Sequence, residues 1–302
     1  MDFPSLKAFV AVAESGSFSR AAEKLFMTQP AISKRIASLE ENLGTPLFDR
    51  LGRGIQLTEA GEKFLASSRR ILTDIAISRE EVRSLSDSVG GKLRLATSHH
   101  VGIHRLPPVL KAFSQAHPNV ELDLLFMDSE LACAEIANGT IELAVVTLPD
   151  QLDENLITQL VWPDPLSIVC AIDHPLAEIV QAALARDKTN QITAGQLTQF
   201  SAVLPARGTV TRAILLNALN PFDVTVETTL ETNYLETIKM MVSVGLGWSA
   251  LPSNMIDAEM MEVPVKGLSM QRHLGSVQLR GRTLSRAALA FLKLLPISMS
   301  QP

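Results

Sequence analysis

The chain has 302 residues, of which 46% are hydrophobic and 20% are charged, with a net charge of −5. This length suffices for about two domains, and the composition excludes a disordered chain because it can supply ordinary globular cores. The net acidity does not exclude a nucleic-acid partner, since DNA binding depends on local basic contacts and residues 1–91 are balanced, with 12 basic and 12 acidic side chains.

Both the start of the chain and its cysteine content predict a cytoplasmic protein. The first 18 residues lack a basic leader before a long apolar run, so we expect neither a signal peptide nor a membrane-spanning helix. The two cysteines, Cys133 and Cys170, are far apart in apolar segments, which is typical of buried thiols in a reducing compartment.

Three short helices are expected at the N-terminus. Apolar side chains recur at spacings of three and four over residues 4–14, and Gly16 ends this helix. Ser17 can cap a second helix over residues 18–26, and Thr28 can cap a third whose proline lies in the tolerated first turn. The third helix has an apolar stripe for the core, formed by Ile32, Ile36, Leu39 and Leu43. Its opposite face near the N-terminal end is small or polar: Gln29, Pro30, Ser33, Lys34 and partly Arg35.

This exposed polar end predicts a helix-turn-helix, because two short helices joined by a tight turn can place the second one in the major groove of DNA. Gln29 can bridge adenine N6 and N7, and Lys34 can reach guanine O6 and N7. Ser33 and Pro30 keep the surface low enough for the backbone to approach the bases. By pattern alone, the alternative is an ordinary capped surface helix of a small helical domain.

A wing is expected after the third helix. Residues 47–58, LFDRLGRGIQLT, read as a strand, a glycine turn and a second strand. Such a wing would bring Arg50 and Arg53 beside the DNA backbone or minor groove, where arginines mainly supply affinity and register.

The run FVAVAESGSFSRAAEKLFMTQPAISKRIASLEENLGTPLFDRLGRGIQLTEAG, residues 9–61, resembles the winged helix-turn-helix of LysR-type transcriptional regulators. The resemblance implies base contacts from Gln29, Pro30, Ser33 and Lys34, and backbone or minor-groove contacts from Thr28, Arg50 and Arg53. Two positions depart from the family pattern: Lys34 stands where arginine is more usual, and Arg35 where glutamine is frequent. Lysine offers a point charge without a planar fork, which weakens discrimination of guanine.

A long helix without proline is expected from Thr58 to Val89, with apolar or serine residues at coiled-coil spacing. The candidate dimerisation residues on this seam are Phe64, Ile71, Ile75, Val82 and Leu85. A narrow seam with charged flanks indicates pairing of two chains, which would present two recognition helices to an inverted repeat. A lone helix packed on its own domain is the alternative. The resemblance implies a homodimer or homotetramer, because in the family this helix dimerises and dimers commonly associate.

The rest of the chain predicts an α/β domain of two lobes. Strands and helices alternate after Gly90 and Gly91, which indicates parallel sheets covered by helices, and the family resemblance implies a type 2 periplasmic-binding-protein-like effector domain. The expected fold is thus this α/β effector domain plus an all-α winged helix-turn-helix domain, joined by a long linker helix. The boundaries expected are 1–58 for the DNA-binding domain, 59–89 for the linker helix and 90–302 for the effector domain, with lobe I at about 92–161 and 268–302 and lobe II at about 162–267.

Small ligands of such sheets bind beyond the C-terminal ends of the strands, where helix N-termini present free N–H groups. The candidate effector ligands at these turns are Thr97, Ser98, His99, Thr147, Arg207, Thr209, Thr229 and Thr232. Together they would suit a small anion such as a carboxylate. The alternatives are plain helix caps for the hydroxyls and a surface ion pair for Arg207. In the LysR-type family the inducer occupies the cleft between the lobes.

No metal site, cofactor or catalytic site is expected. His100 and His104 would share a face if a helix started early, but no Asp, Glu or Cys stands at ligand spacing beside them. The GxSxG, Walker, HExxH and CxxC signatures are absent from the sequence, which argues against an enzyme.

These features predict a ligand-responsive transcription factor that binds double-stranded DNA at an inverted repeat as a dimer or tetramer. Its effector would be a small anionic metabolite, RNA polymerase is a candidate partner, and no membrane partner is expected. One alternative is a cytosolic small-molecule-binding or catalytic α/β protein with a helical dimerisation arm. Another is an architectural DNA-binding protein whose cleft is empty.

Overall fold

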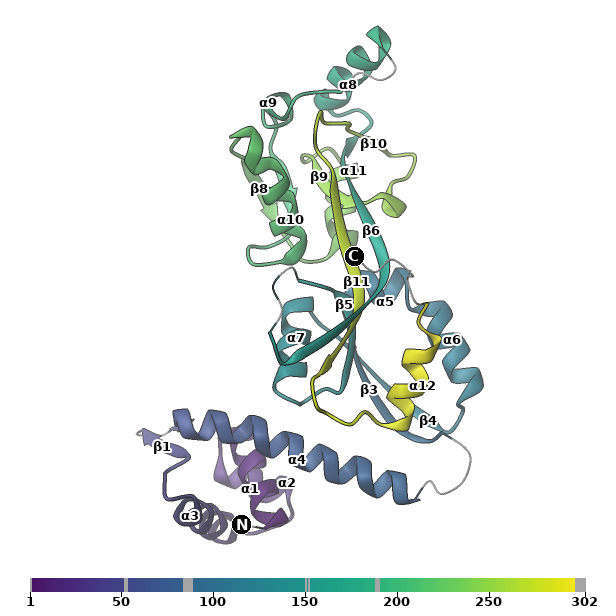
Figure 1. The fold of residues 1–302 in the computed structure, drawn as a ribbon. Coiled ribbons are helices and arrows are strands. Elements are labelled where there is room, and N and C mark those ends of the chain that lie inside the picture. Colours follow the sequence, from purple (N-terminus) through teal and green to yellow (C-terminus); the bar gives the residue numbers. More distant parts are fainter. Residues whose placement is uncertain are drawn as a thin grey trace.

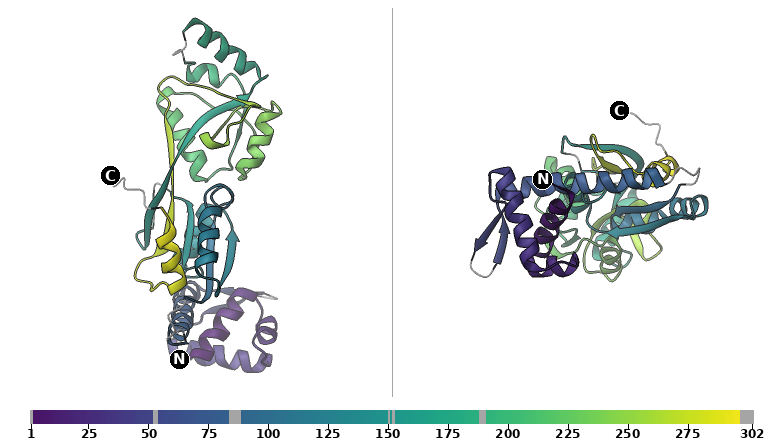
Figure 2. Two further views of the ribbon diagram at one scale, coloured as in Figure 1. Left: turned by 90° about the vertical axis from the view of Figure 1, so that its right-hand side faces the viewer. Right: turned by 90° about the horizontal axis from the view of Figure 1, so that it is seen from below.

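The computed structural model describes residues 2–51, 54–83, 89–149, 151, 153–187 and 191–296. These residues form an elongated molecule, with a helical N-terminal part at one end, a long connecting helix, and two lobes that follow one after the other (Figures 1 and 2). Within these ranges no helix combines the length and the apolar character needed to cross a membrane.

The N-terminal part is a three-helix unit with a β-hairpin. Its elements are α1 (Phe3–Ser15), α2 (Phe18–Lys24), α3 (Gln29–Leu43), β1 (Phe48–Leu51) and β2 (Gly54–Leu57). Asp2 caps α1 by accepting from the Ser5 amide at 2.9 Å, and Gly16 ends it at a φ of 60°, a left-handed conformation that glycine adopts without cost. Three residues of the apolar stripe predicted for α3 lie in the core, where Ile32, Ile36 and Leu39 are at most 2% exposed. The fourth, Leu43 in the last turn, is 38% exposed, so the buried stripe ends one turn earlier than predicted.

The long helix α4 (Glu59–Arg83) follows the hairpin. Its first turns complete the N-terminal core, because the Phe64 ring lies 5.1 Å from the Phe9 ring and Leu72 packs against the same cluster. Gly61 permits this close packing, since a methyl group at that position would overlap the Leu47 carbonyl oxygen. The predicted continuation of this helix over residues 84–88 lies outside the described residues.

Lobe I contains the parallel strands β3 (Gly91–Thr97), β4 (Val120–Phe126) and β5 (Leu143–Thr147) and the helices α5 (His99–His104), α6 (Pro107–Ala116), α7 (Ser129–Ala137) and α12 (Arg286–Leu294). The two faces of the sheet are covered separately. Leu95 and Val145 pack in the cluster under α6 and α12, whereas Ala96 and Val146 pack under α7. This alternation is what two-sided burial of a strand requires.

Two long strands pass from lobe I into lobe II: β6 (Leu156–Ala171) and β11 (Met270–Leu279) pair antiparallel over ten positions (Figure 1). With β9 (Ser249–Pro252) and β10 (Met260–Glu262) of lobe II, the described residues form a seven-stranded sheet of order β10-β6-β11-β5-β3-β4, in which β9 pairs with β6. The predicted lobe boundary at 161/162 falls inside β6. The lobes are therefore joined by hydrogen-bonded strands, not by loops.

Lobe II adds the short strands β7 (Ala202–Leu204), β8 (Thr228–Glu231), β9 (Ser249–Pro252) and β10 (Met260–Glu262), and the helices α8 (Pro175–Arg186), α9 (Ala194–Leu197), α10 (Val210–Leu219) and α11 (Leu235–Ser243). Short 3-10 turns occupy Asn220–Phe222 and Ser253–Met255. Trp248 anchors the core, fully buried, with its indole N–H donating to the Phe200 carbonyl at 2.8 Å.

The predicted alternation of strands and helices is confirmed, with differences at particular elements. The main sheet is not wholly parallel as expected, because β6 pairs antiparallel with β9, β10 and β11. Cys133 and Cys170 are free and buried as expected, and burial raises the pKa of each thiol to about 11.

Candidate functional site

The N-terminal end of α3 presents the polar face expected of a recognition helix. Thr28, Gln29, Pro30 and Lys34 are exposed and Ser33 is half-buried. The Gln29 amide donates to the Ser33 hydroxyl at 3.1 Å, an exposed bond that a base could replace. Thr28 occupies the N-cap position in extended backbone, although its side chain makes no capping hydrogen bond.

Three arginines were also predicted to contact DNA. One of them is partly engaged within the chain, and the side chains of the other two are not among those described. Arg35 is half-buried and lies 3.9 Å from Asp2, so it is partly engaged within the chain. Arg50 belongs to β1, where it pairs with Ile55 of β2 and thereby lies in the wing, but its side chain is not among those described. Arg53 lies outside the described residues.

The predicted seam on α4 is divided between two uses. Phe64 packs into the chain's own N-terminal core, and the Ser68 hydroxyl is fully buried without a partner among the described residues. Ile71 and Ile75 remain partly exposed further along the helix. The side chain of Val82 and all of Leu85 fall outside the description. Of the predicted dimerisation residues whose side chains are described, Ile71 and Ile75 are thus the two that lie outside the N-terminal core.

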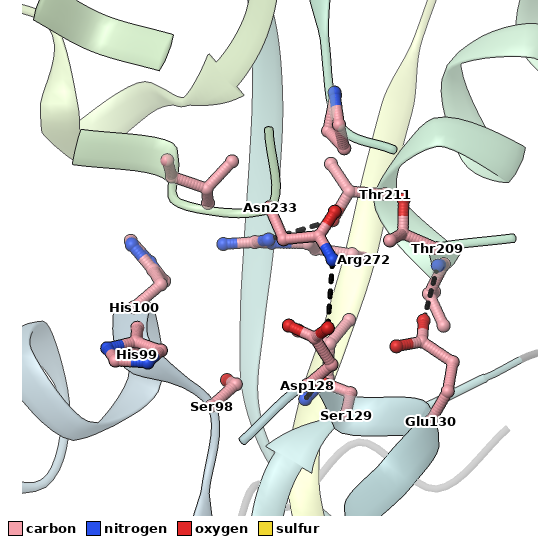
Figure 3. A pocket seen from close by; sticks show the side chains of 14 residues that line it. Ser98, His99, His100, Asp128, Ser129, Glu130, Thr209, Thr211, Asn233 and Arg272 are labelled. Atoms are coloured by element: carbon pink, nitrogen blue, oxygen red, sulfur yellow. Dashed lines mark hydrogen bonds between the residues drawn. The ribbon is translucent and has the colours of Figure 1, made fainter. Parts of the chain in front are cut away.

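A pocket lies between the two lobes, at the C-terminal ends of β3 and β5, with a cavity of about 60 Å³ (Figure 3). We refer to it as the cleft pocket. Its lining comes from lobe I, lobe II and β11: Ser98, His99, His100, Asp128, Ser129, Glu130, Thr147, Pro205, Thr209, Val210, Thr211, Asn233, Leu235 and Arg272. The structure thus brings together four of the predicted effector ligands, namely Ser98, His99, Thr147 and Thr209.

The other four predicted ligands do not line the pocket. Thr97 is fully buried behind it and donates to the Val145 carbonyl at 2.8 Å. The Arg207 side chain is 87% exposed and lies 3.8 Å from Glu231, which corresponds to the surface ion pair named as its alternative. Thr229 is exposed on β8, and the Thr232 hydroxyl accepts from the Tyr234 amide at 3.4 Å.

The arginine of the cleft pocket is Arg272, on β11. Its side chain is 2% exposed, its Nε donates to Asp164 Oδ2 at 2.6 Å, and its Nη1 donates to the Thr211 hydroxyl at 3.0 Å. Nη2 has no partner among the described residues. Asp164 also accepts from Arg105 Nη2 at 2.7 Å. Burial opposes the charge of Asp164, but Arg272 and Arg105 outweigh it, so the pKa of this carboxyl lies below its usual value.

Carboxylates of α7 connect the lobes across the cleft pocket. Glu130 Oε1 accepts from the Val210 amide in the first turn of α10 at 2.7 Å. Asp128 Oδ2 accepts from the Asn233 amide group at 2.8 Å (Figure 3). Asn233 Oδ1 in turn accepts from the Ala206 amide at 3.0 Å. An acidic side chain therefore occupies the helix N-terminus that would otherwise attract an anion from solution.

Sequence reasoning missed Arg272, Asp164, Glu130 and Asn233. A signal for Arg272 was available, because it lies in phase with buried Met270 and Leu274 in an alternating strand. A charged residue at an inward strand position is rarely left without a function or a partner.

His100 and His104 also differ from expectation, since α5 does begin at His99 and places both on one face, with ring centroids 4.8 Å apart. The missing acidic neighbour comes from lobe II, where Glu236 Oε1 lies 2.9 Å from His104 Nε2. Burial and the charge of Arg272 lower the pKa of His100 to about 3, so this imidazole is neutral.

Comparison with known proteins places these features in a family. Residues 3–62 match "Bacterial regulatory helix-turn-helix protein, lysR family", and residues 86–297 match "LysR substrate binding domain". The chain belongs to the LysR family of transcriptional regulators. It is therefore a DNA-binding transcriptional regulator with an effector domain, as the sequence predicted, and this is not a family of enzymes.

Relatives and solved structures of the LysR family match along almost the whole chain. The RuBisCO operon transcriptional regulator of Acidithiobacillus ferrooxidans is 29% identical over 295 residues, covering 96% of this chain and 92% of the relative. A full-length OxyR variant from Pseudomonas aeruginosa superimposes with a TM-score of 0.75 at 22% identity, covering 100% of this chain and 99% of the other. Full-length CbnR in complex with its target DNA gives 0.63 at 20% identity, covering 98% and 99%. These structures share the fold predicted here.

Proposed function

We propose that the protein binds an inverted-repeat operator in the cytoplasm, as a homodimer or homotetramer, and responds to a small anionic metabolite in the cleft pocket. The observation that carries the effector part is the Arg272 guanidinium, which is 2% exposed and keeps Nη2 without a partner among the described residues. A buried cationic donor with an unused N–H group is suited to a ligand carboxylate.

Other groups of the pocket support a definite class of effector. The Ser98 hydroxyl is buried without a described partner and can donate to the same anion. In the same lobe as Ser98, Asp128 and Glu130 present carboxylate oxygens that prefer a hydroxyl or an ammonium group. A small hydroxy acid or amino acid combines an anion with such donors. Turnover is not part of this proposal, and the pocket acts by binding alone.

On DNA, we propose that Gln29 and Lys34 read base edges while Thr28, Pro30 and Ser33 fit the helix end against the groove. Arg35, Arg50 and Arg53 would add contacts to the backbone or minor groove. Two such surfaces require two chains, and α4 would provide the pairing through Ile71 and Ile75. RNA polymerase is the further partner proposed for the DNA-bound assembly.

The response would depend on the hydrogen bonds that connect the lobes. An effector anion would compete with Glu130 for the Val210 amide at the start of α10, and its binding would change the angle between lobe I and lobe II. Such a ligand can shift the assembly only by the difference in its affinity for the two arrangements. The effector would bind more tightly to the arrangement in which its carboxylate has replaced Glu130 at the start of α10.

The test begins with genomic fragments selected by the purified full-length protein, followed by a thermal-shift screen with small hydroxy acids and amino acids. We expect salt-dependent operator binding and at least one acid that raises Tm and alters the retardation pattern on operator DNA. Ser98→Ala should weaken that acid at least about tenfold with unchanged affinity for DNA, because one charge-assisted hydrogen bond is lost. The matched control is Thr229→Val, a hydroxyl outside the pocket, which should respond as the wild type does. Absence of operator binding, or no response to any acid, would contradict the proposal.

A further inference from the structure

A second group of titratable side chains lies at the edge of the cleft pocket, where His100 belongs to the lining and His104 and Glu236 do not. His100 and His104 are four residues apart on α5, so they project from the same face of the helix. Glu236, in the first turn of α11, approaches from lobe II, and its Oε1 lies 2.9 Å from His104 Nε2. One nitrogen or oxygen from each of the three residues lies within 4.8 Å of the others.

His100 is the unusual member of this group. Its side chain is 5% exposed, yet neither Nδ1 nor Nε2 has a hydrogen-bond partner among the described residues. Figure 3 shows the ring projecting from α5 toward lobe II. The nearest carboxylate oxygen, Asp164 Oδ2, lies 3.8 Å from Nε2, beyond hydrogen-bond distance. Buried polar atoms are nearly always satisfied, and an imidazole nitrogen without a hydrogen-bond partner is available to bind a metal ion.

We propose that His100, His104 and Glu236 bind a divalent transition-metal ion, with Zn²⁺ as the best fit, and that this ion joins lobe I to lobe II. Two imidazoles and a carboxylate form a donor set that zinc accepts, and three protein ligands leave a fourth position for water or a small ligand. Magnesium and calcium would require oxygen donors instead. The sequence did not indicate this site because its carboxylate is 132 residues away from His104.

The geometry needs only a modest adjustment. Zinc bonds of about 2.0–2.2 Å hold tetrahedral ligand atoms about 3.3–3.6 Å apart. The His104–Glu236 pair at 2.9 Å would open slightly, and the widest separation of 4.8 Å would close by an amount that a side-chain rotation at His100 can supply.

The charges around the group permit a cation. The charged neighbours are Arg105 and Arg272, which both bond to Asp164, and Glu236 itself. Two positive and two negative side chains cancel, so a divalent ion meets no net repulsion from them. A hydrogen bond or ion pair between His104 and Glu236 without metal would explain the 2.9 Å contact, but it leaves both nitrogens of His100 unexplained.

The test uses tag-free, metal-stripped, full-length protein titrated with Zn²⁺ by calorimetry, and with Co²⁺ to obtain the absorption bands of a low-coordinate site. We expect one ion per chain and a higher Tm with Zn²⁺. His104→Gln and Glu236→Gln should each weaken Zn²⁺ at least about 100-fold, more than a residue outside the coordination shell would cost. These side chains are 33% and 36% exposed, so both variants are expected to fold. The matched control is His117→Gln, at the end of α6, which should bind Zn²⁺ as the wild type does.

Two results would overturn the proposal. Wild-type protein that takes up no Zn²⁺ near neutral pH would show that the contact between His104 and Glu236 is an interlobe bond alone. Equal Zn²⁺ affinity in wild type, His104→Gln and Glu236→Gln would place any bound ion elsewhere. Neither result bears on operator binding or on the response to acids, because the metal site does not depend on the anion site.

Discussion

Asp164 provides the sharpest test of how the cleft pocket is held together. Its side chain is 1% exposed and accepts from Arg272 Nε at 2.6 Å and from Arg105 Nη2 at 2.7 Å. Asp164→Asn retains the shape and one acceptor but removes the charge that balances the buried Arg272. Removal of one partner from a buried ion pair costs about 3–5 kcal/mol, because the other charge stays desolvated. We expect a loss of this size in the free energy of unfolding of the effector domain.

A matched control comes from the other end of lobe I. Asp123 also lies between two cations, Lys92 and Arg94, each at 3.1 Å, but both cations are half-exposed. Exposed pairs contribute about 0–1 kcal/mol, so Asp123→Asn should cost about 1 kcal/mol or less. Each carboxylate pairs with two cations, so the difference in stability between the two variants measures the effect of burial.

The assay is urea unfolding followed by tryptophan fluorescence. Both tryptophans of the chain, Trp162 and Trp248, lie in the effector domain, so the signal reports that domain alone. The expected loss corresponds to a Tm lower by roughly 6–20 °C at about 2–4 °C per kcal/mol. A combined Asp164→Leu and Arg272→Met variant should regain most of the stability. If Asp164→Asn costs no more than Asp123→Asn, the reasoning about the buried pair is wrong.

Three further predictions concern the N-terminal part. Gln29→Ala should reduce the preference for operator over random DNA by about 1–3 kcal/mol in competition titrations, and an equal loss on both DNAs would contradict base reading. Phe26→Asn should stabilise the N-terminal unit by about 1 kcal/mol in urea unfolding followed by circular dichroism, because Phe26 is 97% exposed and held at a φ of 54°, which asparagine tolerates better. Leu25→Asn, beside it and half-buried, should destabilise instead, and a loss of stability in Phe26→Asn would show that the exposed ring has a packing role. Ile71→Asp and Ile75→Asp should lower the mass measured by light scattering, since each places a charge in the expected seam between chains, and an unchanged mass would exclude that seam.

Features that depend on a few neighbouring residues could be predicted from the sequence. The start and end of α3 follow from Thr28, from Pro30 in the first turn and from the left-handed Gly44, all within one segment. The apolar period of that helix also fixes which face remains exposed. The wing and the alternation of strands in lobe I were accessible for the same reason, because each pattern is completed within a single element.

The cleft pocket could be predicted only in part, because its chemistry is assembled over long separations. Small ligands bind beyond the C-terminal ends of parallel strands, which predicts that hydroxyls after β3 and β5 line the site. Ser98 and Thr147 do line the pocket. Arg272 and Asp164 are 108 residues apart, and nothing local specifies that they meet. Arg207 is predicted because it lies at a strand-to-helix turn, yet a turn residue is free to face solvent, whereas strand register forces Arg272 inward.

The shared strands β6 and β11 determine how this protein can be divided for laboratory use. Each lobe builds its sheet on one end of both strands, so a piece cut at the crossover would expose unpaired backbone groups along its length. A biosensor or crystallisation fragment of the effector half therefore has to begin ahead of Gly91 and extend beyond Leu294. Smaller fragments that carry one lobe should aggregate when expressed.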